Sequence, residues 1–392
     1  MSTRNVITEG SSGIGNTPAI RATPGRRIVA RPEDARSHNR VHVLQVLYRS
    51  AGLSRADIAR ELGLTRVTVS EVVAALIAEG LVVELDPRAD SRPGKPATPL
   101  DINRSGFHVI GVDFSSSHTF RGAITDLSGE VLEHHKVSVE GLVGDAAVAA
   151  AGDLIEVLMA KATKPVIGVG VGSPGLINDH GEVLSAPGLG WHRVPLQALL
   201  TQRVGVPVLV ANDANAAALA ERTFGSGSDD LMVVRIGRGV GSGLVVGGHP
   251  LRGARWAAGE IGHVVVGTDQ GPPCSCGKNG CLETWIAAPR IEARLTQAST
   301  DAQKREVIAQ AGARLGEALA PVVGALNLEE IVVAGPAEVL SDVFVGALST
   351  TLGEHTMDDL HGHLTVRATT LAPHTVILGA VVMVLSTQLG VS

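Results

Sequence analysis

The chain has 392 residues, 44% of them hydrophobic, and a formal net charge of −6. This length predicts two or three folding units with substantial apolar cores, and it excludes a single small domain. The longest apolar run, at residues 375–385, is too short to span a bilayer, so we expect a buried helix there and no membrane partner. No secretory signal precedes the chain, which favours a reduced, cytoplasmic location.

The charge is distributed unevenly along the chain. Residues 1–104 hold 15 Lys and Arg against 11 Asp and Glu, and the remaining residues hold 18 against 28, so the net charges are +4 and −10. This division suits a nucleic-acid reader joined to an acidic ligand-binding body. Residues 1–37 are rich in Gly, Ser, Pro and Arg and have no apolar period, which predicts a disordered tail.

Capping signals divide residues 41–80 into three predicted helices. Ser54 precedes Asp57 by three residues, which is the spacing of a capping box at the start of the second helix. Gly63 ends that helix, and Thr65 is placed to N-cap the third.

The third predicted helix has an apolar face toward the core and leaves small polar residues and one arginine outward near its start. This arrangement predicts a helix-turn-helix whose second helix enters the major groove of DNA. The DNA-contacting candidates on it are Thr65, Arg66, Val67 and Ser70. A helical protein-interaction domain is the alternative.

Residues 81–86 predict a strand, and the segment that follows resembles the wing of a winged helix. Arg92 and Lys95 flank Pro93 and Gly94 at its tip. A narrow tip that carries an arginine suits the minor groove, so Arg92 and Lys95 join the DNA-binding candidates. An ordinary charged turn followed by a linker is the alternative for this tip.

From residue 107 the pattern changes to strands joined by short turns and then to alternating helices and strands, which predicts an α/β fold. Asn212 and Asp213 stand at the end of one of these strands, with an Ala-rich helix directly behind them. Polar groups in that position commonly line the ligand crevice of an open sheet.

Gly237, Gly239, Gly241 and Gly243 alternate within apparent strand sequence. Alternating glycines mark a close approach of the backbone, either to a ligand or in a tight hairpin. The residues alone leave both interpretations open.

The three cysteines of the chain, Cys274, Cys276 and Cys281, fall in one short stretch soon after His263. Three thiolates and one imidazole make a tetrahedral zinc set. Burial as small hydrophobes is a poor alternative, because the stretch contains glycine and lysine. A disulfide would leave one cysteine over. We therefore predict a structural Zn²⁺ site with these four ligands.

The motifs SPGLIN, NDANAAALAE, GVGSGLVVGG, GEIGH and CSCGKNGCLE occur in this order and resemble those of the ROK family of sugar kinases and sugar-responsive repressors. The resemblance implies an actin-like, two-lobed α/β fold with a sugar in the cleft and a homodimer as the working unit. Whether dimers pair further into a tetramer stays open. The expected domains are a tail at 1–37, a winged helix-turn-helix with its linker at 38–104, and the body at 105–392, whose smaller lobe spans about 105–211 plus 374–392 and whose larger, zinc-containing lobe spans about 212–373.

The resemblance also implies sugar-binding roles for five residues that match its motifs. Asn212, Asp213, Glu260, His263 and Glu283 would hydrogen-bond sugar hydroxyls. His263 would have two duties, with one ring nitrogen on zinc and the other facing the sugar. In that arrangement zinc orients the site and takes no part in chemistry.

In kinases of the family the residue matching Asp213 is the general base that takes a proton from the attacking sugar hydroxyl. The family's first phosphate loop reads DxGGTK, whereas this chain has Asp113, Phe114, Ser115, Ser116, Ser117 and His118 there. Arg238 also stands in the second loop where kinases usually have threonine. We therefore expect no ATP binding and no enzymatic activity, and an ATP-dependent sugar kinase with Asp213 as its base is the alternative.

Together these motifs predict a regulator of carbohydrate genes, most simply a repressor. Its expected partners are a palindromic double-stranded DNA operator, read by a dimer, and a sugar or sugar derivative as effector. Sugar binding would draw the two lobes together and change the spacing of the winged helices. A zinc-stabilised interaction protein, which would bind neither sugar nor specific DNA, is a third alternative.

Overall fold

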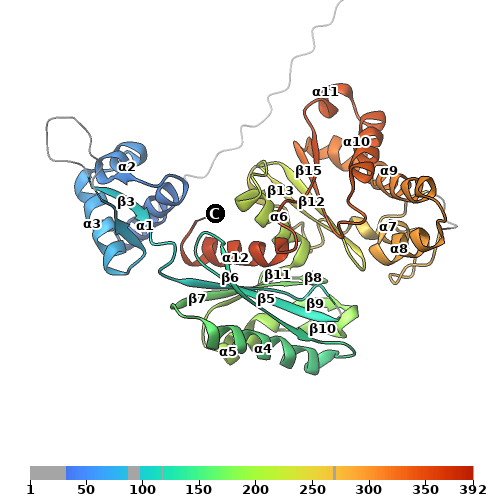
Figure 1. The fold of residues 1–392 in the computed structure, drawn as a ribbon. Coiled ribbons are helices and arrows are strands. Elements are labelled where there is room, and N and C mark those ends of the chain that lie inside the picture. The colour runs from blue at the N-terminus through green and yellow to red at the C-terminus, as the bar shows by residue number, and fades with distance from the viewer. Residues whose placement is uncertain (1–31, 87–97, 117, 268–270, 392) are drawn as a thin grey trace, which may run out of the picture.

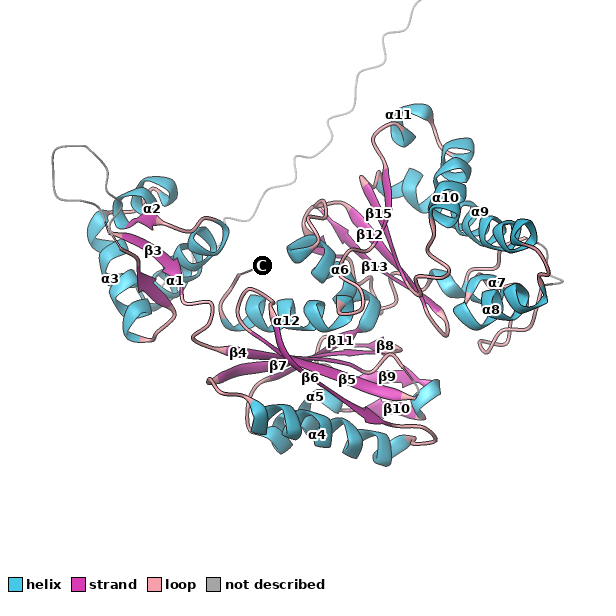
Figure 2. Cartoon of the chain, in the orientation of Figure 1, coloured by secondary structure: helices cyan, strands magenta, loops and turns pink. Residues whose placement is uncertain are grey.

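Three units follow one another along the chain in the computed structural model, which describes residues 32–86, 98–116, 118–267 and 271–391 (Figure 1). A small helical domain comes first, and two lobes, each with a five-stranded sheet, form the body (Figure 2). The α/β class predicted from the order of strands and helices is confirmed.

The first unit is a winged helix with three helices and a three-stranded sheet of order β1-β3-β2. Its elements are α1 (Pro32–Arg49), β1 (Leu53–Ser54), α2 (Arg55–Leu62), α3 (Arg66–Ala78), β2 (Val82–Glu84) and β3 (Pro99–Ile102). β2 and β3 are antiparallel neighbours, as expected for the two strands of a wing. The predicted tip with Arg92 and Lys95 lies outside the described residues.

The predicted helix caps are confirmed. Ser54 and Asp57 form a capping box at the start of α2, and Gly63 ends that helix in the left-handed region with φ 64°. The hydroxyl oxygen of Thr65 accepts a hydrogen bond from the Thr68 amide at 3.1 Å, so Thr65 is the N-cap of α3. Local hydrogen bonds therefore define the turn between the two helices.

The first helix begins earlier than the sequence analysis predicted. α1 starts at Pro32, so residues 32–37, which we expected in the disordered tail, are helical. Proline is tolerated in the first turn, because its missing N–H would lack a partner there in any case. Arg36 and Ser37 are exposed, and this turn therefore carries no apolar period that would reveal a helix.

The two faces of α3 differ in burial as the apolar period predicted. Val69, Val73 and Leu76 are fully buried in the core of the winged helix. The opposite face near the start of the helix is open to solvent and carries the four candidates Thr65, Arg66, Val67 and Ser70.

The small lobe is a sheet of order β11-β7-β4-β5-β6, in which β11, β7 and β4 are parallel and β5 and β6 antiparallel. Its elements are β4 (His108–Asp113), β5 (Thr119–Thr125), β6 (Val131–Ser138), α4 (Gly144–Lys161), β7 (Val166–Ser173), β8 (Leu176–Ile177), β9 (Val183–Ala186), η1 (Pro187–Leu189), β10 (Trp191–Val194), α5 (Leu196–Val204), β11 (Val208–Asn212) and α12 (Thr375–Gln388). Helices α4 and α5 cover one face and α12 the other (Figure 1). Every residue of β4 is consequently buried.

The large lobe repeats this pattern in a sheet of order β14-β13-β12-β15-β16. Its elements are α6 (Asp213–Phe224), β12 (Leu231–Ile236), β13 (Val240–Val246), β14 (His249–Pro250), η2 (Ile261–His263), α7 (Glu283–Ile286), α8 (Ala288–Gln297), α9 (Asp301–Leu326), β15 (Glu330–Ala334), α10 (Asp342–His355), α11 (Asp358–His361) and β16 (Thr365–Ala368). Alternate residues of β12 face opposite cores. Met232 and Val234 join the core under α9 and α10, whereas Leu231 and Val233 pack against α6.

Helix α12 links the body to the winged helix. Its C-terminal residues Leu385 and Leu389 belong to the same apolar cluster as Val43 and Leu47 of α1. Two hydrogen bonds join the units at this end: Gln45 Nε2 donates to the Gly390 carbonyl at 2.9 Å, and the Tyr48 hydroxyl donates to the Leu127 carbonyl at 3.0 Å. The winged helix is thus packed on the body and is not merely tethered to it.

A search of the described helices for a membrane span finds none that combines sufficient length with sufficient apolarity. Residues 375–385, the apolar run, lie within α12, and most of them are buried in the body.

Candidate functional site

A cleft of about 590 Å³ lies between the two lobes. The end of β11, the start of α6, the β12–β13 turn, η2 and α7 all contribute residues to its wall. Each of the five residues named as sugar-binding candidates lines this cleft: Asn212, Asp213, Glu260, His263 and Glu283. Residues far apart in the sequence are therefore brought to one polar surface.

Asn212 is the N-cap of α6. Its side-chain oxygen accepts hydrogen bonds from the amides of Ala214 and Asn215, at 2.9 and 3.1 Å. Its Nδ2 donates to the Gly175 carbonyl at 3.0 Å. Much of the hydrogen-bonding capacity of this amide therefore holds the start of α6, and one Nδ2 hydrogen remains for a ligand.

Asp213 forms an ion pair with Arg235 of β12. Arg235 Nη1 donates to one carboxylate oxygen, and the other oxygen accepts the Ala214 amide at 2.8 Å. Burial raises the pKa of Asp213, and the nearby guanidinium of Arg235 opposes that shift. Asp213 thus has a permanent cationic partner that opposes its protonation, which disfavours a role as general base.

Arg235 also reaches across the cleft to the small lobe. Its Nη2 lies 3.2 Å from the Ser115 hydroxyl oxygen, to which it donates. Ser115 in turn directs its amide and its hydroxyl to Asp113, at 2.9 and 2.5 Å, and Arg121 donates to the other oxygen of Asp113 at 2.7 Å. A continuous polar chain therefore joins Arg235 of β12 in the large lobe to Ser115 and Asp113 in the small lobe.

The mouth of the cleft carries a second contact between the lobes. Arg238, at the β12–β13 turn, has its Nη1 3.3 Å from Nε2 of His118. Both residues are exposed. The β12–β13 hairpin and the small-lobe loop after β4 are therefore in contact twice, once through Arg235 and Ser115 and once through Arg238 and His118.

The glycine pattern at residues 237–243 has two separate explanations. The Gly237 amide donates to the Gly239 carbonyl at 2.9 Å, which closes the turn between β12 and β13. Gly243 lies directly on the backbone of α6, where a side chain would collide with Ala214. The structure therefore contains the predicted hairpin of β12 and β13. Gly243 lies outside its turn, and close packing on α6 explains why it is glycine.

Glu260, His263 and Glu283 line the same cleft as Asp213. Burial raises the pKa of Glu260, while His263 opposes the shift. Glu283 Oε1 lies 3.0 Å from Cys274 Sγ and 3.6 Å from Nδ1 of His263. This carboxylate therefore stands between the cleft and the cysteine cluster.

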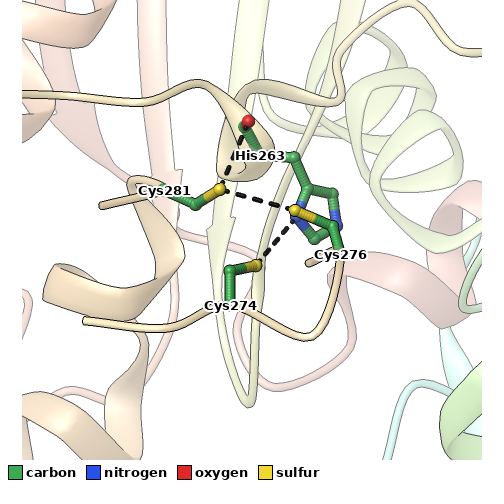
Figure 3. A group of neighbouring side chains, drawn as sticks. All are labelled: His263, Cys274, Cys276 and Cys281. Carbon is green, nitrogen blue, oxygen red and sulfur yellow. Dashed lines mark hydrogen bonds between the residues drawn. The ribbon is translucent and has the colours of Figure 1, made fainter. Parts of the chain in front are cut away.

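His263, Cys274, Cys276 and Cys281 form a group that could hold a metal ion, with all four ligand atoms within 4.8 Å of one another (Figure 3). Cys274 Sγ lies 3.4 Å from His263 Nδ1, and Cys276 Sγ lies 3.6 Å from Cys281 Sγ. Burial raises the pKa of Cys274 to about 12, and the backbone amide of Lys278 lowers the pKa of Cys276 to about 7. A bound metal would deprotonate all three thiols, because only the thiolate is a ligand.

Residues 109–387 match the ROK family, and residues 37–93 match the MarR family. The first match covers well over half of the chain. The chain belongs to the ROK family. The actin-like body with a winged helix in front, which the motifs led us to expect, is confirmed.

Among ROK relatives, a putative xylose repressor of Caldicellulosiruptor sp. (strain Rt8B.4) is 29% identical over 90% of this chain and 96% of its own length. The transcriptional dual regulator NagC of Escherichia coli K12 is 28% identical over 84% and 87%. A glucokinase of Halalkalibacterium halodurans is 31% identical, but covers 60% of this chain and 82% of its own.

Two solved ROK structures show the same division between regulators and kinases. A transcriptional regulator described as a homologue of the E. coli MLC protein has a TM-score of 0.80 at 26% identity and covers 91% of this chain and 97% of its own. A Streptomyces griseus glucokinase, solved with glucose and AMPPNP, has a TM-score of 0.63 at 25% identity and covers 70% and 98%. Beyond the ROK body, the regulator also matches the winged helix.

Arg235 was not among the site residues predicted from the sequence, although Arg238, three residues later, was noted. The available signal was a lone arginine inside the otherwise apolar strand LMVVRI. A charged side chain in buried strand sequence requires a partner, and this ROK chain supplies Asp213.

Proposed function

We propose that this ROK chain is a sugar-responsive, DNA-binding transcriptional repressor. The observation that carries the proposal is the presence of both functions in one chain: a winged helix with an open α3 face, and a cleft lined by all five sugar candidates. Relatives that match 90% and 84% of the chain are named putative xylose repressor and N-acetylglucosamine repressor. The effector class is accordingly a sugar or sugar derivative.

Zinc is the proposed metal of the cysteine cluster. A zinc tetrahedron with Zn–S bonds of about 2.3 Å and a Zn–N bond of about 2.0 Å has S–S edges of roughly 3.8 Å and S–N edges of roughly 3.5 Å. The distances between Cys276 and Cys281 Sγ, 3.6 Å, and between Cys274 Sγ and His263 Nδ1, 3.4 Å, fit these edges. With four protein ligands the site is closed, which supports a structural and not a catalytic role.

In the proposed mechanism, His263 binds zinc through Nδ1 and presents Nε2 to the sugar. Glu260 and Glu283 accept hydrogen bonds from hydroxyl groups on the same side of the cleft. Closure of the lobes on the sugar moves α6 and α12, and the chain directly after α12 is hydrogen-bonded to α1 of the winged helix through Gln45 and Gly390. Two readers in a homodimer then change their spacing relative to the half-sites of a palindromic operator.

The DNA-binding proposal is tested by recovering genomic fragments of the source organism that the purified full chain binds at physiological salt, and sequencing them. We expect a few palindromic sites beside genes for sugar uptake or breakdown. No enriched site, with and without sugars, would contradict a repressor function.

Replacing Arg66 with alanine is expected to weaken operator binding by about 10-fold to 100-fold, because one good DNA contact contributes about 1–3 kcal/mol. Arg66 is exposed at the start of α3 and can be removed without disturbing the core. Arg305→Ala, which removes an exposed arginine of α9, is the charge-matched control and should bind normally. Fluorescence anisotropy with a labelled operator measures both. Equal affinity of the two variants would exclude Arg66 from the interface.

Asp213→Ala is expected to abolish the effect of sugar on operator binding while leaving binding without sugar intact, since the reader lies elsewhere. Glu260→Gln tests the same cleft without breaking an ion pair, and it should lower the affinity for the sugar at least about tenfold. Operator titrations with and without sugar give the readout. A wild-type protein on which sugar has no effect would contradict the proposal, whatever the variants do.

A sugar kinase is the alternative function, and the position of Asp213 in the cleft is the observation that favours it. Two features oppose it: Arg235 occupies the carboxylate of Asp213, and the amide of Ser115 bonds Asp113 where a nucleotide phosphate would need it. A coupled assay for ADP release with common hexoses and N-acetylhexosamines distinguishes the two. Turnover would establish the kinase.

A further inference from the structure

A second cavity, of about 540 Å³, lies between α7, α8 and α9, on the side of the large lobe away from the winged helix (Figure 1). The indole of Trp285 lines it together with Ile286 and Ala311, which belong to the main core of the lobe. A cavity of this size accommodates a metabolite-sized ligand. We call it the α9 groove.

The α9 groove is separate from the interlobe cleft. Helix α7 contributes Glu283 to the lining of the cleft, and Trp285 and Ile286 to the lining of the groove. The two linings share Thr284 and Arg290. A ligand in the groove therefore lies beside the cleft without occupying any of the five sugar candidates.

Three arginines line the α9 groove with little acidic charge to balance them. Arg290 and Arg294 stand four residues apart on α8, a spacing at which like charges on a helix repel each other, and Arg314 belongs to α9. Within the described residues none of the three is in an ion pair, and Glu317 is the one acidic residue of the lining. This positive charge stands out in a body, residues 105–392, that holds 18 Lys and Arg against 28 Asp and Glu.

Arg294 is held in place by a neutral partner on α9. Its Nη2 donates to Gln310 Oε1 at 2.5 Å, and Gln310 Nε2 donates to Glu306 Oε1 at 2.6 Å. Gln310 also lines the groove. An amide orients the guanidinium but leaves its charge uncompensated, so Arg294 is preorganised for an anion.

Trp285 provides the second feature that favours a ligand in the α9 groove. Its Nε1 is buried and has no hydrogen-bond partner among the described residues. The guanidinium of Arg314 lies over the same ring, 4.4 Å from its centroid. No hydrogen bond therefore fixes the indole, and an oxygen acceptor that enters beside Arg314 would satisfy the N–H after a small movement of the ring.

We propose that the α9 groove is a second ligand site, which binds a small organic anion with two or more acidic groups between Arg294 and Arg314 and beside Trp285. A phosphate ester and a polycarboxylate share the chemistry that matters: several acceptor oxygens, which guanidinium groups bind in a bidentate manner. The anion also offsets the repulsion between Arg290 and Arg294 on α8. This site is additional to the proposed function, because it requires neither a sugar nor DNA.

The test is calorimetric titration of the full chain with 3-phosphoglycerate and with citrate, at low ionic strength, where surface charges are weakly screened. Glycerol serves as the neutral probe and should not bind. We expect at least one of the two anions to bind with one site per chain, and the stronger of them identifies the preferred acidic group. Binding should also change the tryptophan fluorescence. Trp285→Phe keeps an aromatic ring under Arg314 and should remove that change.

Two variants locate the anion. Arg294→Gln and Arg314→Gln each remove one charge from the groove, and neither residue lines the interlobe cleft. Each is expected to weaken anion binding at least about tenfold. Should the loss of the contact with Trp285 prevent Arg314→Gln from folding, Arg314→Lys keeps the charge and lacks the planar fork, so it should weaken binding as well. Arg305→Gln is the control, because Arg305 is exposed on α9 outside the lining of the groove.

The outcomes separate this proposal from the proposed function. If wild type binds neither anion, or if binding is unchanged in the variants of both Arg294 and Arg314, the site is overturned. If these variants instead dissociate an oligomer and wild type binds no anion, the groove is a contact between copies of the chain, which also overturns it. A chain that binds the anion but no sugar keeps this site and loses the proposed function.

Discussion

Replacing Cys281 with serine is expected to remove the metal and to lower the stability of the large lobe by at least about 3 kcal/mol. That loss corresponds to a fall of roughly 6–12 °C in Tm for a lobe of this size. Cys281 is fully buried and lies beside Leu282, which is part of the main core of the lobe. Structural zinc sites contribute directly to folding free energy, so loss of one ligand exposes the core to local unfolding.

The measurement is metal content by mass spectrometry together with calorimetric unfolding. Wild type should carry one zinc per chain, Cys281→Ser should carry none, and a chelator should lower the Tm of wild type by a similar amount. Lys278 lies between Cys276 and Cys281 but is not a ligand, so the Lys278→Ala variant should keep its zinc and the Tm of wild type. A wild-type protein without metal, or a Cys281→Ser protein that keeps its zinc and its Tm, would refute the zinc site.

Loss of the metal should also impair the cleft. Glu283 lies 3.0 Å from Cys274 Sγ, and His263 belongs to both the cluster and the cleft wall. A zinc ion bound there would therefore fix two of the sugar candidates through their immediate surroundings. We expect protein whose metal has been removed by a chelator to lose sugar binding while its winged helix is still folded. The core of the winged helix shares no residue with the cysteine cluster.

Features that depend on neighbours in the sequence were predictable. The capping box of Ser54 and Asp57, the Gly63 stop and the Thr65 cap are each determined within four residues, and the structure contains all of them. The cysteine cluster and the end of β11 were also recognisable, because each places its functional groups in one short stretch. The order of the motifs then indicated the ROK family, and the resemblance to that family predicted the two-lobed body.

Features that depend on distant strands were not predictable in the same way. Arg235 pairs with Asp213 because β12 and the start of α6 meet at the cleft, and no local pattern contains both residues. Nor did the sequence reveal that Ser115 would turn its amide toward Asp113. The first turn of α1 escaped notice for another reason, since exposed residues there carry no apolar period.

Gly379→Ala is expected to destabilise the protein by about 3 kcal/mol or more, at the upper end of the cost of overpacking a core. Gly379 lies in the middle of α12, and a Cβ there would overlap the carbonyl oxygen of Ala216 in α6. The obstacle is backbone, which cannot rotate away as a side chain can. In most helices the same substitution stabilises, so the expected sign is opposite to the helix propensity of alanine.

Gly346→Ala provides the matched control. Gly346 lies within α10, is exposed, and has open space where its Cβ would be. Alanine there should stabilise by about 0.5–1 kcal/mol, because glycine loses more backbone entropy in a helix. Denaturant unfolding of both variants measures the two free energies. If Gly379→Ala unfolded like wild type, the tight contact between α12 and α6 would be wrong.

Under the proposed function, this contact would transmit effector binding from the cleft to the winged helix. A helix of 14 residues spans about 21 Å, so α12 can extend from its contact with α6 toward the winged helix. Its first turns contact α6, which carries Asp213, and directly after its last turn the Gly390 carbonyl accepts a hydrogen bond from Gln45 of α1. With glycine at the crossing, the helices lie too close to slide independently. A shift of α6 on effector binding would therefore move α12 and, with it, the winged helix.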